Sequence, residues 1–68
     1  MATTGEVARR DAAAKVLKAE LDRNVDRFYA DRFTHGDFQK ANRATWEKIE
    51  ATGTEVVDEV LRLIRADL

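Results

Sequence analysis

Three short stretches of the sequence share one pattern, and that pattern is typical of the start of an α-helix. ATTGEV (residues 2–7), FTHGDF (33–38) and ATGTEV (51–56) each consist of an apolar residue, Thr, two further residues, an acid and an apolar residue. Such a Thr accepts a hydrogen bond from the first helical turn, the acid bonds back to the backbone N–H of the Thr, and the apolar pair packs across the turn. The sequence therefore predicts three helices, with Thr3, Thr34 and Thr52 as their N-caps.

The composition agrees with a helical chain. It includes no proline, and its three glycines all lie inside the three stretches, where they can end the preceding helix or ease the turn. No cysteine is present, so neither disulfides nor a thiolate zinc site can stabilise the fold. A chain of this size buries only about 60% of its unfolded surface, so its core is thin. We predict an all-α fold with one domain over residues 1–68, in which residues 1–3 are disordered.

Between the three stretches, the apolar residues recur with helical spacing and form one stripe on each predicted helix. The first helix spans about 29 residues and about 44 Å, and the next two span about 16 and about 14 residues. The stripes consist of Val7, Ala14, Leu17, Leu21, Val25 and Phe28; of Phe38, Ala41, Thr45 and Ile49, with Trp46 at the edge; and of Val57, Val60, Leu61, Ile64 and Leu68, widened by Val56 and Leu63. We expect a small bundle in which the long helix reverses at THGD, and the spacing leaves open whether the third helix packs on the first or on the second.

His35, the single histidine, could begin a metal or acid–base site with Asp37 nearby. A zinc site needs three or four protein ligands, and the sequence offers neither a second His nor a Cys. Capping explains the stretch, so we interpret His35 as a solvent-facing residue in the first turn of the second helix. Asp22 and Asp26 are neighbours on the first helix and are interpreted as part of a solvated face. With no glycine-rich phosphate loop and no nucleophile motif, we expect no enzyme, no cofactor and no metal.

The 12 basic and 13 acidic residues are interspersed along the chain and give a net charge of −1. A helix-turn-helix made of the last two helices is disfavoured, because the third begins with the acids Glu55, Asp58 and Glu59. One basic concentration remains, and it comprises Arg9, Arg10, Lys15 and Lys18. The alternative function is therefore a small DNA-associated regulator that binds through this basic patch, although nucleic acid is not the expected partner.

Our leading hypothesis is a helical protein–protein interaction or regulatory module that forms homo-oligomers, because two short helices cannot cover all the apolar stripes. Another protein is a further expected partner. The interface candidates are Leu17, Leu21, Trp46, Val56, Val60 and Leu63. Trp46 has a second interpretation as a core residue. Apolar runs are only a few residues long, so we expect no membrane association and a cytoplasmic protein.

Overall fold

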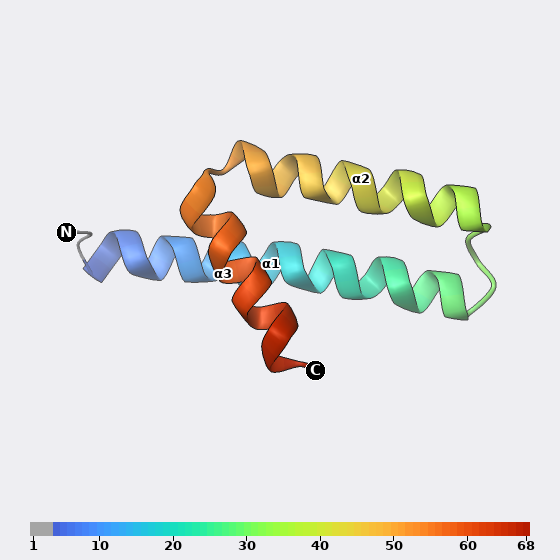
Figure 1. The fold of residues 1–68 in the computed structure, drawn as a ribbon, viewed down its shortest axis with the longest axis horizontal. Helices are drawn as coiled ribbons and strands as arrows, with labels where there is room; N and C mark the ends of the chain where they lie inside the picture. The colour runs from blue at the N-terminus through green and yellow to red at the C-terminus, as the bar shows by residue number, and fades with distance from the viewer. Residues whose placement is uncertain (1–3) are drawn as a thin grey trace.

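The structure is a computed structural model that describes residues 4–68, and in this range it consists of three α-helices and no strand. Helix α1 spans Thr4–Tyr29, α2 spans His35–Ala51 and α3 spans Thr54–Ala66 (Figure 1). The predicted all-α fold, with one long helix followed by two shorter ones, is confirmed. The predictions for residues 1–3, including Thr3 as an N-cap, lie outside the described residues.

Helix α1 has 26 residues and ends at Tyr29, a few residues earlier than the spacing of the stripes predicted. Asp31 adopts a left-handed conformation with φ 59°. Its N–H bonds to the carbonyl of Phe28, and the N–H of Arg32 bonds to the carbonyl of Arg27. These two bonds form a Schellman motif, in which Asp31 occupies the position that glycine most often takes. Asp tolerates this conformation better than most residues, so the helix stops without a glycine.

Helix α2 begins with the capping box that the sequence predicted. The Thr34 hydroxyl accepts a hydrogen bond from the Asp37 N–H at 3.1 Å, and the Asp37 carboxylate accepts one from the Thr34 N–H at 3.3 Å. The equivalent prediction for Thr52 is wrong. Thr52 is instead the C-cap of α2, with helical backbone dihedrals, and its hydroxyl donates to the carbonyl of Ile49.

The N-cap of α3 is Gly53, which provides no side-chain cap. Gly53 has φ 114°, a conformation that residues with a Cβ rarely adopt. The connection between α2 and α3 is so short that the chain must turn at this one residue. The glycine therefore sets the start of α3, and the cap lies one residue later than the Thr pattern predicted.

Helices α1 and α2 form an antiparallel hairpin, and α3 turns back from the end of α2 and crosses α1 (Figure 1). The packing of α3 is mainly against α1, which answers the question that the sequence left open. The molecule measures 44 × 23 × 15 Å. It is therefore a flat hairpin with one short helix lying across it, and α3 covers only part of the hairpin face.

The core lies where the three helices meet. Its buried apolar members are Ala14, Leu21, Ile49, Val56 and Val60, and the half-buried residues packed against them are Leu17, Trp46, Val57, Leu63 and Ile64. Val25 was predicted to share the core stripe of the first helix, but 36% of its surface is exposed. Because α3 crosses α1 upstream of Val25, no helix covers that position.

A buried polar pair joins α1 to α2. The Asn24 Nδ2 donates a hydrogen bond to the Thr45 Oγ1 at 3.1 Å, and this hydroxyl donates to the carbonyl of Ala41 at 3.0 Å. Asn24 is 4% exposed and Thr45 is 1% exposed. Thr45 lies on the buried face as predicted, whereas no pattern in the sequence indicates that Asn24 is its partner. Since only one helix register brings the two groups together, the pair favours the observed alignment of the hairpin.

Candidate interaction surface

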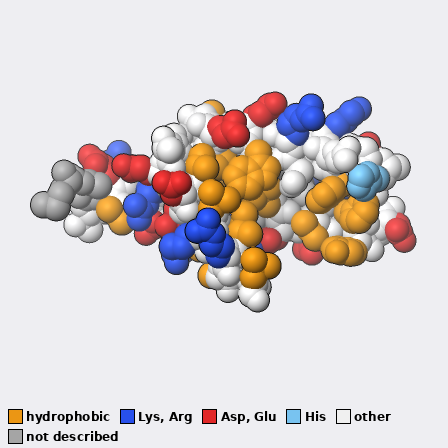
Figure 2. All heavy atoms as spheres, in the orientation of Figure 1, with side chains coloured by type: hydrophobic (Ala, Val, Ile, Leu, Met, Phe, Trp, Pro, Cys, Tyr) orange, Lys and Arg blue, Asp and Glu red, His pale blue; other side chains and the backbone are white. Residues whose placement is uncertain are grey.

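Helix α3 carries two neighbouring apolar stripes: the first is largely buried in the core, and the second packs against the core only in part. Val56 and Val60 are buried, and Leu63 packs beside them. The second set, called the outer stripe from here on, consists of Val57, Leu61, Ile64 and Leu68. The first three are half-buried and Leu68 is fully exposed. Figure 2 shows a band of hydrophobic side chains that runs along α3 and reaches α2.

The outer stripe stays accessible because of the way α3 packs. A helix that crosses one neighbour buries a single side of its surface, and α2 contacts α3 much less than α1 does. The described residues 4–68 contain no fourth helix that could cover the other side. Apolar surface on α3 is therefore available to a partner.

The six predicted interface residues fall into two groups. Leu21, Val56 and Val60 are buried inside the single chain, where a partner cannot reach them without unfolding it. Leu17, Trp46 and Leu63 are half-buried at the edges of the core and keep accessible surface. Leu61 and Leu68 also keep accessible surface but are not among the six predicted residues. Their spacing with Val57 and Ile64 could have identified them, because intervals of four, three and four residues place all four on one side of a helix.

Two opposite charges lie beside the outer stripe. Asp58 is in the first half of α3 and Arg65 is in its last turn, and both side chains are exposed. Within residues 4–68 neither of them forms an ion pair. By contrast, the Arg62 Nε donates to the Glu59 carboxylate at 3.0 Å. This hydrogen bond lowers the pKa of Glu59 and raises the pKa of Arg62. Asp58 and Arg65 are therefore among the charged residues of the described chain that have no ion-pair partner.

The predicted basic patch is largely compensated by acids. The Lys18 Nζ lies 2.8 Å from the Asp22 carboxylate and also bonds to Asp67, the C-cap of α3, and these two carboxylates raise the pKa of Lys18. Arg10 lies 3.0 Å from the carboxylate of Asp11. Only Arg9 and Lys15 remain as exposed members of the patch without an ion pair in the described chain.

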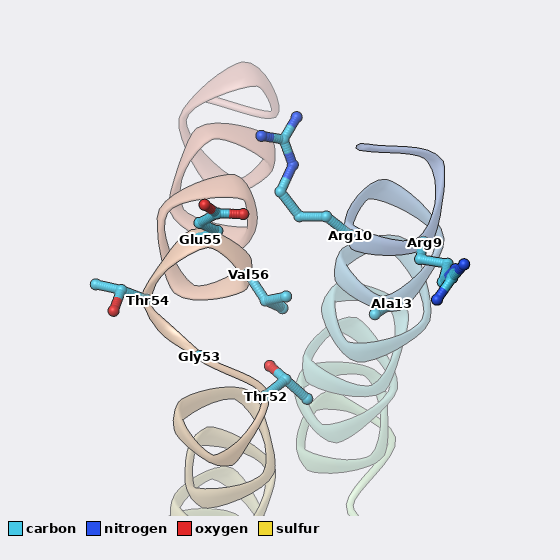
Figure 3. A pocket seen from close by; sticks show the side chains of 8 residues that line it. All are labelled: Arg9, Arg10, Ala13, Thr52, Gly53, Thr54, Glu55 and Val56. Carbon is cyan, nitrogen blue, oxygen red and sulfur yellow. The ribbon is translucent and has the colours of Figure 1, made fainter. Parts of the chain in front are cut away.

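Part of the same patch borders an open groove of about 410 Å³ between α1 and the α2–α3 turn. Figure 3 shows that Arg10 extends toward α3, whereas Arg9 points away from the groove. Glu55 lies on the opposite wall. Because both signs of charge line the groove, it does not form a continuous positive surface for a phosphate backbone.

His35 lies in the first turn of α2 with its side chain exposed. Its ring packs edge-on against Phe28 with 6.1 Å between the ring centroids, and Phe28 also contacts Phe38. No group of three or more His, Cys, Asp or Glu side chains in residues 4–68 is arranged to hold a metal ion. His35 therefore belongs to the aromatic cluster that closes the turn of the hairpin.

None of the helices in the described part of the chain is both long and apolar enough to span a bilayer. The described residues thus form a small three-helix chain with accessible apolar surface on α3. No protein-family model, curated protein or solved structure matches this chain.

Proposed function

We propose that this chain is a small helical interaction module that self-associates through apolar surface on α3. The observation that carries the proposal is the imbalance between its thin core and its accessible apolar surface. Only five apolar side chains are buried in residues 4–68, whereas all four residues of the outer stripe keep accessible surface: Val57, Leu61 and Ile64 are half-buried and Leu68 is fully exposed. Domains of this size are marginally stable on their own, so burial of this stripe by a partner is a substantial gain.

The size of the accessible surface supports the same proposal. A compact protein of 7.7 kDa exposes about 4,300 Å², and the chain exposes 5157 Å². Its radius of gyration is 13.1 Å, compared with about 11 Å for a compact domain of this length. The excess surface, about 860 Å², reflects the elongated shape of the chain, and it includes the accessible apolar surface of α3.

A regulatory role through another protein is compatible with this proposal, since an amphipathic helix of a different chain could pack on the same stripe. A nucleic-acid role is less well supported. Two of the four residues in the basic patch, Arg10 and Lys18, already pair with carboxylates, and the groove beside them contains Glu55. A protein that binds phosphates needs several uncompensated cations on one face.

Thermal unfolding at different protein concentrations tests self-association. If folded chains are dimers that unfold to separate chains, a hundredfold increase in concentration stabilises the dimer by about 2.7 kcal/mol. For two chains of this length, that corresponds to an increase in melting temperature of about 10 °C. A melting temperature that does not change with concentration would contradict the proposal.

A further inference from the structure

We infer that self-association occurs by antiparallel pairing of α3 with α3 of a second copy along the outer stripe, about a two-fold axis. This inference rests on the proposed function and specifies the surface and the orientation. The outer stripe consists of Val57, Leu61, Ile64 and Leu68, as defined above. Helix α3 crosses α1 on one face of the hairpin (Figure 1), and all four residues of its outer stripe keep accessible surface.

The spacing of the outer stripe is that of a coiled-coil seam. Intervals of four, three and four residues place its members at alternating a and d positions of a heptad. In an antiparallel pair, Leu61 of one chain then packs beside Ile64 of the other, and Val57 packs beside Leu68. All eight apolar side chains of the two stripes face one another, and none is left at an unpaired end.

The charges beside the stripe select the antiparallel orientation. With Leu61 and Ile64 at the centre, Asp58 of one copy lies beside Arg65 of the second copy, and symmetry repeats this contact on the other side of the axis. Neither residue has an ion-pair partner within residues 4–68, and both are exposed. A parallel pair leaves both residues without an opposite charge, because like residues then lie at the same level on opposite sides of the seam.

The properties of the outer stripe favour a second copy of this chain as the partner that covers it. Leu68 is fully exposed and Val57, Leu61 and Ile64 are half-buried, so a second copy buries apolar surface that the single chain leaves accessible. The acid and the base that flank the stripe also make it complementary to itself under a two-fold rotation, as an isologous contact requires. One antiparallel arrangement therefore buries the apolar residues of the stripe and also gives Asp58 and Arg65 an opposite charge.

Charge reversal tests the pairing without disturbing the core. In Asp58→Arg, two arginines of opposite chains meet at each contact, and in Arg65→Glu two acids meet. Each variant should weaken the homodimer about tenfold. Mixing the two variants should restore association as a heterodimer, because every contact again joins an acid to an arginine. The control is Arg23→Glu, an exposed reversal on α1 that should leave association unchanged.

Sedimentation velocity on each variant and on the equimolar mixture measures these effects, with circular dichroism to confirm the helix content. Recovery in the mixture excludes misfolding as the cause of the single-variant defects. If the unmodified chain dimerises but neither reversal weakens it, the inferred surface is wrong while self-association stands. If the unmodified chain stays monomeric at all concentrations, both the inference and the proposed function are wrong.

Discussion

Replacement of Thr45 by Val should destabilise the chain, because it removes the hydroxyl that accepts the hydrogen bond from Asn24. The two side chains have nearly the same shape, so packing changes little. Asn24 is 4% exposed and cannot exchange its lost partner for bulk water. A buried donor without a partner costs about 1–3 kcal/mol. For a domain of this length, that cost corresponds to a decrease in melting temperature of about 4–20 °C.

Urea denaturation followed by circular dichroism measures this cost, at one fixed protein concentration so that association does not change the baseline. The double variant Asn24→Leu/Thr45→Val provides the control. It removes both polar groups, so it should recover much of the stability that Thr45→Val loses, and the two substitutions should be strongly non-additive. A neutral effect of Thr45→Val would refute the reasoning, because it would show that the hydrogen bond contributes nothing net to the fold.

Three further outcomes follow from the same structure. Thr34→Ala should lower the free energy of unfolding by about 1 kcal/mol, whereas His35→Ala should change it little and EDTA should have no effect on the melting temperature of either variant. Arg62 lowers the pKa of Glu59, so this carboxylate stabilises the fold at a pH above its unfolded pKa. The stabilisation is lost as the pH falls through the folded pKa. Glu59→Gln should therefore reduce the loss of stability on acidification below about pH 4.5. Fluorescence anisotropy with duplex DNA should detect no binding at physiological salt, and tight binding that is lost on reversal of Arg9 and Lys15 would instead favour the DNA-associated role.

Features that depend on short stretches of sequence could be predicted well. The number of helices and the capping box at Thr34 follow from hydrophobic spacing and from contacts between residues three positions apart. The two errors in helix boundaries arise from backbone conformation. Asp31 and Gly53 have positive φ values, and each sets a boundary that the Thr and apolar patterns alone do not indicate.

Features that depend on how helices cross could not be predicted. The exposure of Val25 follows from the position at which α3 crosses α1, and nothing near Val25 in the sequence specifies that position. For the same reason, the burial of Asn24 appears only once α2 is aligned with α1. The candidate surface was partly accessible from the sequence. The width of the apolar face on the third helix is evident from the sequence. The packing of α3 decides which of its two stripes is the more deeply buried, and so which one keeps accessible surface for a partner.

The mass of the folded chain in solution tests the central claim most directly. Multi-angle light scattering over a concentration series should give a mass that rises from 7.7 kDa toward twice that value, with the midpoint at micromolar concentration. Leu61→Ser should shift this midpoint to higher concentration, because it removes a central apolar contact, whereas Val16→Ser, at a 65% exposed position on α1, should not. A mass that stays at 7.7 kDa throughout the series would contradict self-association.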